Sequence, residues 1–169
     1  MIKIKDVKLT KSGVSIEYEK YTPDPEDHQN MVKDTLTLSR PLEPHPDFVK
    51  CFDSLVPHFY NIAELGPAPQ KPTTKKGLEA YKVTLVKFSE GETFKAVQLH
   101  GQKTLESGEV INILCPRRRY EAEQDNEYGY FEHLGKCAVK FLAEAQAYLD
   151  GKHKEPAQQA LPLDGDGKK

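Results

Sequence analysis

The chain has 169 residues, of which 37% are hydrophobic and 30% are charged, and its formal net charge at pH 7 is −2. This length suits about one domain, and the composition predicts a modest core that carries long polar loops. No apolar run approaches the ~20 residues that span a bilayer. The N-terminal stretch MIKIKDVKL alternates charged and apolar residues, unlike a signal peptide, so we expect a cytoplasmic protein with no membrane partner.

The first 40 residues predict three strands. The apolar alternation of the opening strand slips after Ile4, which indicates a β-bulge near Asp6. A turn at residues 11–13 leads into a returning strand over 14–18, and residues 32–38 fit a third strand.

A helix is predicted next, because His45-Pro46-Asp47 is a typical helix start and apolar residues follow at helical spacing as far as Ile62. Proline in a helix interior removes a hydrogen bond, so Pro57 predicts a kink or a break at Leu55-Val56. The proline- and lysine-rich residues 66–77 predict a linker or mobile loop.

The second half repeats this order. Alternating apolar residues predict strands over residues 81–85, 94–99 and 110–114, with Pro116 ending the third. Apolar residues at 3–4 spacing then predict a helix from about Glu127 to Asp150, and Gly151 supplies its C-terminal stop.

Together these elements predict an α+β fold. Its mainly antiparallel sheet has the order β-β-β-α-β-β-β-α along the chain, with two helices packed on it. Residues 1–150 form a single domain with a possible internal break at 66–77, and residues 151–169 form a disordered tail. The pattern leaves open whether the two sets of strands form one sheet or two.

Catalytic and metal-binding motifs are not found in the sequence. The histidines share no ligand spacing such as H-x-x-x-H, and Cys51, Cys115 and Cys137 form no C-x-x-C pair. No glycine-rich phosphate loop or G-x-S-x-G turn occurs. We therefore expect reduced thiols, no metal, no cofactor and no enzymatic activity.

The distribution of charge points to nucleic acid. Residues 71–119 carry 10 Lys/Arg against 5 Asp/Glu, whereas residues 120–150 carry 2 against 7. Arginine binds phosphate through two parallel hydrogen bonds, and an adjacent tyrosine can stack on a base. The predicted nucleic-acid-binding residues are Arg117, Arg118, Arg119, Tyr120, Lys82, Lys95 and Lys103. The alternative is that the arginines pair with the acidic residues that follow them.

The C-terminal residues Gln158-Gln159-Ala160-Leu161-Pro162-Leu163 resemble the bacterial sliding-clamp binding peptide. The resemblance implies that Gln158 is the glutamine anchor and that Leu161 and Leu163 fill an apolar pocket of the clamp. Gln159 stands where that peptide usually has leucine.

Nearly the whole chain also resembles small uncharacterised phage and prophage proteins. The segments that carry this likeness are MIKIKDVKL, SGVSIEY, HPDFVKCFDSLVPHF and LHGQKTLESGEVINILCP. Such proteins accompany phage replication and recombination genes.

The sequence thus predicts a non-enzymatic accessory protein of phage DNA metabolism. It would bind single-stranded nucleic acid and recruit a replication partner, such as a sliding clamp, through its tail. The alternative function is a phage inhibitor or sponge that binds a host defence protein or a signalling nucleotide.

Overall fold

Seven strands and two helices make up the regular structure of the computed structural model, which describes residues 1–27, 30–67, 69–91, 94–121 and 128–154. The strands are β1 (Ile2–Leu9), β2 (Val14–Pro23), β3 (Met31–Arg40), β4 (Tyr81–Glu90), β5 (Lys95–Thr104), β6 (Val110–Leu114) and β7 (Arg118–Arg119). The helices are α1 (Pro46–Ile62) and α2 (Phe131–Leu149). The predicted α+β order is confirmed, and the short β7 is an addition to it.

All strands belong to one sheet, ordered β3-β2-β1-β4-β5-β6, with β7 paired to β5 beside β6. Neighbouring strands run antiparallel throughout. The two halves of the chain meet at β1 and β4, whose register extends only from Asp6 opposite Lys87 to Lys8 opposite Leu85. The strands of both halves therefore form one sheet, joined in the middle by a short seam.

The predicted bulge in β1 is confirmed, since its register against β2 shifts between Ile4 and Asp6. Side chains alternate between the two faces of a strand, and one extra residue shifts that alternation. Ile4 and Val7 are consequently both buried although they lie three positions apart. The bulge therefore keeps both ends of β1 in contact with the core.

Helix α1 begins where the sequence predicts, with the His45 ring nitrogen accepting a hydrogen bond from the Asp47 backbone N–H at 3.2 Å. The predicted break at Leu55-Val56 is wrong, because the helix runs unbroken from Pro46 to Ile62 with Pro57 inside it. Pro57 removes one helical hydrogen bond, but its ring is buried. Packing on both sides of the helix offsets that loss.

Helix α2 begins at Phe131, later than predicted, and ends at the expected glycine. Gly151 has a φ of +105°, a left-handed conformation that favours glycine, and its N–H bonds the Tyr148 carbonyl. Lys152 then pairs with Glu144 at 2.9 Å, and Lys154 with Glu43 at 2.6 Å. Gln158, Leu161 and Leu163 lie outside the described residues.

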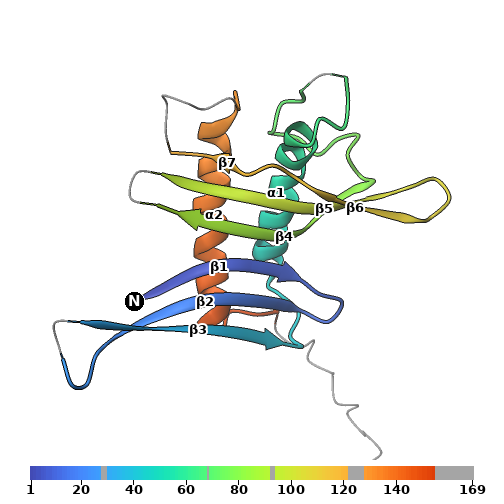
Figure 1. The fold of residues 1–169 in the computed structure, drawn as a ribbon. Coiled ribbons are helices and arrows are strands. Elements are labelled where there is room, and N and C mark those ends of the chain that lie inside the picture. Colours follow the sequence, from blue (N-terminus) through green and yellow to red (C-terminus); the bar gives the residue numbers. More distant parts are fainter. Residues whose placement is uncertain (28–29, 68, 92–93, 122–127, 155–169) are drawn as a thin grey trace, which may run out of the picture.

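Both helices pack on the same face of the sheet (Figure 1). Their contact centres on aromatic rings, with the Phe141 ring of α2 4.7 Å from Phe52 and 5.3 Å from Phe48, both on α1. Phe88 of β4 completes the group at 5.8 Å from Phe141. This cluster joins the two helices and the sheet into one core.

The predicted linker, residues 66–77, is tied to α1 where it is described. The Asn61 side chain both donates to the Gln70 carbonyl and accepts from the Gln70 N–H, each at 2.7 Å. Lys75 pairs with Asp53 at 2.6 Å, and Leu78 just beyond is fully buried. These contacts fix the segment against the helix layer.

In the part of the chain that the structure describes, no helix is long and apolar enough to cross a membrane. The three cysteines are free, with Cys51 and Cys115 buried and Cys137 partly buried.

Candidate functional site

The sheet face opposite the helices, here called the open face, carries the side chains that alternate with the buried ones. The strand registers identify the residues on this face, and register partners on neighbouring strands form rows across the sheet. One row contains Ser15, Lys8, Leu85, His100 and Leu114. The next row contains Glu17, Asp6, Lys87 and Gln98.

In the β1–β3 half of the open face, a buried carboxylate neutralises the lysines. Glu19 lies 3.4 Å from the amine of Lys5 and 3.2 Å from that of Lys33. Tyr21 donates a hydrogen bond to it at 2.6 Å. The hydrogen bond from Tyr21, with those from Lys33 and Lys5, holds the pKa of Glu19 at about 2, below its ordinary value of 4.5.

Replacing Glu19 with glutamine is expected to destabilise the protein at pH 7, where the native carboxylate is ionised and paired. A carboxyl group whose pKa is lower in the folded protein stabilises the fold at pH values above its pKa in the unfolded chain. This stabilisation is lost as the pH falls toward its pKa in the folded protein. The difference between Glu19→Gln and wild type should therefore shrink between about pH 4.5 and about pH 2.

Urea unfolding at several pH values measures this difference. Glu17→Gln is the matched control, since Glu17 lies on the same strand and face but makes no ion pair within the described residues. A constant difference across the pH range would contradict the role of the Glu19 charge.

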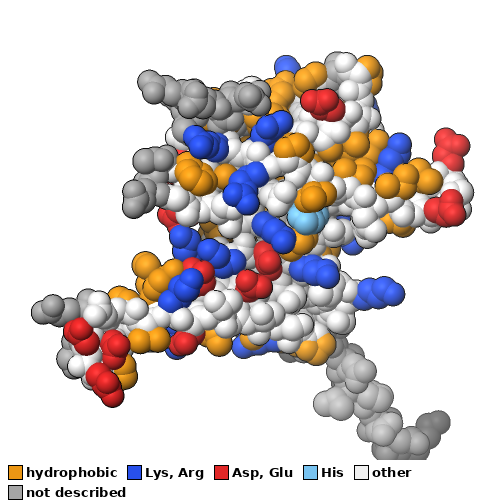
Figure 2. All heavy atoms as spheres, viewed as in Figure 1, with side chains coloured by type: hydrophobic (Ala, Val, Ile, Leu, Met, Phe, Trp, Pro, Cys, Tyr) orange, Lys and Arg blue, Asp and Glu red, His pale blue; other side chains and the backbone are white. Residues whose placement is uncertain are grey.

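In the β4–β7 half of the open face, the lysines are not neutralised in this way. Lys82 and Lys87 make no ion pair with any residue that the structure describes. Their register partners on β5 are the neutral side chains Gln102 and Gln98, whereas on β1 Asp6 stands opposite Lys87 without an ion pair to it. Figure 2 shows this face, with Lys and Arg side chains in a band over its middle and many Asp and Glu side chains at the hairpin tips.

His100 lies within the same half. Burial, with a further contribution from Lys87, lowers the pKa of His100, so its ring is neutral at pH 7. Its Nε2 atom is buried and has no hydrogen-bond partner among the described residues. The positive charge of this half therefore comes from Lys82, Lys87 and Arg119. Arg119 lies on β7, where its register partner on β5 is Ala96.

The structure divides the predicted nucleic-acid-binding residues between the two sides of the sheet. Lys82 and Arg119 belong to the open face, where the Arg119 guanidinium lies 4.8 Å from the centre of the Phe94 ring. Arg118 borders a cavity with Tyr60 on the helix side, and the Lys103 amine lies 5.6 Å from the Tyr81 ring centre. Arg117 is exposed in the connection before β7.

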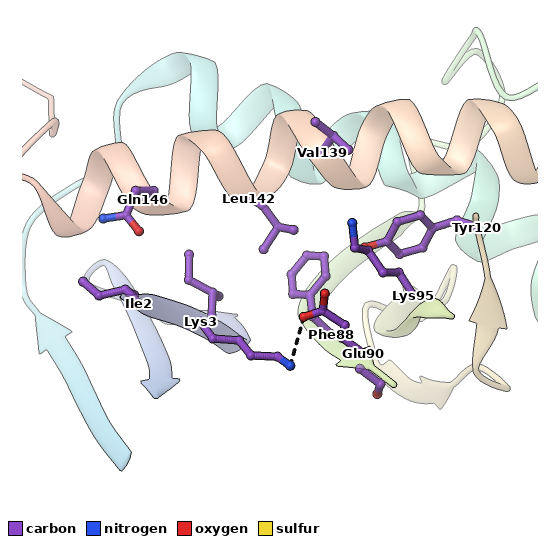
Figure 3. Close-up of a pocket in the computed structure, with 11 residues that line it drawn as sticks. Ile2, Lys3, Phe88, Glu90, Lys95, Tyr120, Val139, Leu142 and Gln146 are labelled. Carbon is purple, nitrogen blue, oxygen red and sulfur yellow. Dashed lines mark ion pairs between the residues drawn. The ribbon is translucent and has the colours of Figure 1, made fainter. Parts of the chain in front are cut away.

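Lys95 and Tyr120 line a small cavity between the sheet and α2 (Figure 3). The cavity has a volume of about 270 Å³ and lies where β1 and β4 no longer pair, with Val139, Leu142 and Gln146 of α2 lining one side. The Lys3–Glu90 ion pair, 2.9 Å long, borders it. The Tyr120 ring is 6% exposed, so it packs in the core rather than presenting a face to solvent.

A second cluster was missed by sequence reasoning. His58 of α1 and His133 and Cys137 of α2 bring their ligand atoms within 4.8 Å of one another. His133 and Cys137 are four residues apart and so share one face of α2. A pattern that requires two histidines at this spacing does not detect a histidine followed by a cysteine. His58 is distant in sequence and joins them only through the packing of the two helices.

The cluster borders a cavity of about 440 Å³ below the 66–77 segment. The cavity wall also carries hydroxyl groups and the side chains Lys50, Lys75, Lys136 and Lys140. Cys137 has its pKa raised by burial, and burial with the charge of His133 lowers the pKa of His58 to about 3. His58 is therefore a neutral ring at pH 7, with one nitrogen hydrogen-bonded to Tyr128 and the other to His133.

Comparison of the sequence with protein-family models, and of the chain with curated proteins and with solved structures, finds no match. Any function must therefore be argued from the geometry of these sites.

Proposed function

We propose that the protein binds single-stranded nucleic acid on the β4–β7 half of its open face. The observation that carries the proposal is the pair Lys82 and Lys87, which form no ion pair within the described structure, although Asp6 of β1 stands opposite Lys87. Lysines of this kind attract phosphates. Gln98 and Gln102 each donate one amide N–H within the sheet, to the Cys115 carbonyl and to Asn112, and their remaining N–H and carbonyl oxygen can bond bases or sugars. The Phe94 ring under Arg119 adds an aromatic surface of the kind on which bases stack.

An antiparallel sheet with one uncovered face suits this role. Side chains on neighbouring strands lie about 4.8 Å apart, so the rows of the open face present a shallow, wide surface rather than a closed pocket. Such a surface accepts an extended strand whose bases are unpaired. Because the chain as a whole carries a net charge of −2, attraction for nucleic acid is expected at this surface rather than over the whole protein. Salt screens exposed charges, so the affinity should fall as the salt concentration rises.

The double variant Lys82→Gln/Lys87→Gln is expected to weaken binding of a fluorescent oligothymidylate about tenfold or more at low salt. Each lost phosphate contact on a single strand lowers the salt slope by about 0.7, so the plot of log K against log salt should become shallower by about 1.4. Fluorescence anisotropy over a range of salt concentrations measures both quantities.

Lys11→Gln/Lys20→Gln is the matched control, because it removes the same charge from exposed residues of the β1–β2 hairpin, outside the proposed surface and outside the cavity beside α2. It should leave the affinity nearly unchanged. An equal loss in both variants, or no binding of wild type at low salt, would contradict the proposal.

Recruitment of a replication partner by the tail is a separate part of the proposal. It rests on the resemblance of Gln158, Leu161 and Leu163 to the sliding-clamp peptide, in a segment outside the described residues. A chain ending at residue 154 should lose binding to a purified bacterial clamp and keep its affinity for the oligonucleotide. Equal clamp binding by the two chains would remove this part and leave the nucleic-acid proposal in place.

A second candidate function is binding of a signalling nucleotide, the alternative that the sequence leaves open. The observation that favours it is the cavity below residues 66–77, where Lys136 and Lys140 stand with Thr73 and Thr74 and suit a phosphate group, while Lys50 and Lys75 are paired with Asp47 and Asp53. A nucleotide retained through purification and released on denaturation would support this candidate. Purified protein free of nucleotide, and unchanged in melting temperature by added dinucleotides, would argue against it.

A further inference from the structure

The side chains of His58, His133 and Cys137 converge from two helices onto one point. The His58 Nε2 atom lies 2.8 Å from His133 Nδ1, and the Cys137 sulfur lies 3.7 Å from that same His133 atom. All three ligand atoms lie within 4.8 Å of one another. Two imidazole nitrogens and one sulfur are a ligand set that late first-row divalent ions prefer.

Two of the three separations can be compared directly with a tetrahedral zinc centre, and the third, from Cys137 to His58, is at most 4.8 Å and would have to shorten to about 3.6 Å. With ordinary Zn–N and Zn–S bonds, ligand nitrogens lie about 3.4 Å apart, and nitrogen and sulfur lie about 3.6 Å apart. The Cys137–His133 distance of 3.7 Å already fits this geometry. The His58–His133 distance of 2.8 Å would have to open by about half an ångström, which a small rotation of the partly exposed His133 ring supplies.

The orientation of His58 is fixed by a group behind it. Its other ring nitrogen, Nδ1, lies 2.7 Å from the hydroxyl oxygen of Tyr128, and both residues are buried. A histidine that binds a metal through one nitrogen commonly donates the other N–H to an oxygen atom, which sets the tautomer and the ring orientation. Tyr128 supplies that oxygen, so Nε2 of His58 is aimed at the cluster.

The cavity gives the centre an entrance and room for a fourth ligand. His133 and Cys137 line its wall, together with the hydroxyl-bearing Ser54, and its volume is about 440 Å³. Lys136 and Lys140 lie on the same wall, and their positive charge opposes a bare cation. An anion such as hydroxide or phosphate in the fourth position offsets that charge.

We propose that His58, His133 and Cys137 bind one Zn²⁺ ion and leave its fourth coordination position open to an anionic ligand from the cavity. This proposal is independent of nucleic-acid binding, because the cluster lies among the helices on the other side of the sheet from Lys82 and Lys87. Three protein ligands with one open position are typical of zinc sites that bind water or substrate rather than purely structural ones.

The test uses the full chain, stripped with a chelator and titrated with Co²⁺, whose spectrum reports a bound thiolate. Wild type is expected to bind one equivalent with a thiolate-to-cobalt absorption band, and one equivalent of Zn²⁺ should displace it. Cys137→Ser should lose the band, and His133→Asn should lower the affinity at least 100-fold. Both residues are partly exposed, so the fold should survive, as circular dichroism can verify.

Two controls remove the same residue types outside the cluster. Cys51→Ala removes a buried thiol, and His153→Asn removes a histidine beyond the end of α2; both should keep the band and the affinity. Tyr128→Phe should weaken Zn²⁺ binding 10- to 100-fold while the band remains, as expected of a positioning residue.

Failure of wild type to bind stoichiometric Co²⁺ or Zn²⁺ would overturn the proposal and leave the cluster as a hydrogen-bonded histidine pair. The same conclusion would follow if Cys137→Ser kept the absorption band. Addition of inorganic phosphate to the cobalt form tests the fourth position, and an unchanged spectrum would refute the anionic ligand.

Discussion

Replacing Phe141 with alanine is expected to lower the free energy of unfolding by about 3–5 kcal/mol. Phe141 is fully buried and its ring lies within 5.8 Å, centre to centre, of Phe48, Phe52 and Phe88. Truncation removes the transfer free energy of the ring and leaves a cavity that three rigid aromatic neighbours cannot fill. The truncation also removes the ring contacts that α2 makes with α1 and with β4.

Urea unfolding followed by circular dichroism measures this loss. Val139→Ala is the control on the same helix, since the Val139 side chain is 61% exposed and should change stability by no more than about 0.5 kcal/mol. A loss below about 1 kcal/mol for Phe141→Ala would mean that the aromatic cluster does not hold the helices on the sheet.

Replacing Gly101 with alanine is expected to cost about 3 kcal/mol although it adds only one methyl group. An added Cβ would lie 2.6 Å from the Phe59 ring and 2.6 Å from the Lys82 backbone oxygen. Neither atom can retreat easily, because Phe59 is fully buried and Lys82 is paired within the sheet. The glycine is what allows α1 to lie close to β5.

A double-mutant cycle tests this explanation. Phe59→Leu shortens the opposing side chain, so Gly101→Ala should cost less in that background than in wild type. Gly129→Ala is the matched control, since an added Cβ there meets no atom within 4 Å. Equal costs of Gly101→Ala in the two backgrounds would show that the contact with Phe59 is not the source of the strain.

Most of the fold could be predicted from the sequence, because its signals are local. Alternating apolar residues mark β1 to β6, a phase slip marks the bulge near Asp6, and the glycine stop of α2 stands at Gly151. Pro57 misled the prediction, since a local penalty was offset by long-range packing that no window of sequence displays. The union of the strands into a single sheet depends on the β1–β4 seam, which is likewise a long-range contact.

The candidate sites were less predictable for the same reason. The basic composition of residues 71–119 drew attention to the half of the sheet that carries the proposed surface, and Lys82 lies on its open face. Composition cannot tell which face a side chain occupies, so Lys95 and Tyr120 were grouped with Lys82 although they border a cavity next to α2. His58 and His133 lie on different helices and are 75 residues apart in sequence, so their contact depends on how the two helices pack.

The way the helices cross the seam has a consequence for how the chain folds. α1 comes from the first half of the chain but packs on β4, and α2, the last element, contacts both α1 and β1. Each half contributes a helix or strands to the core of the other, so we expect a chain that lacks α2 to form no stable unit. We therefore expect slow, single-step folding dominated by long-range contacts, with the two halves of the sheet appearing together rather than in succession.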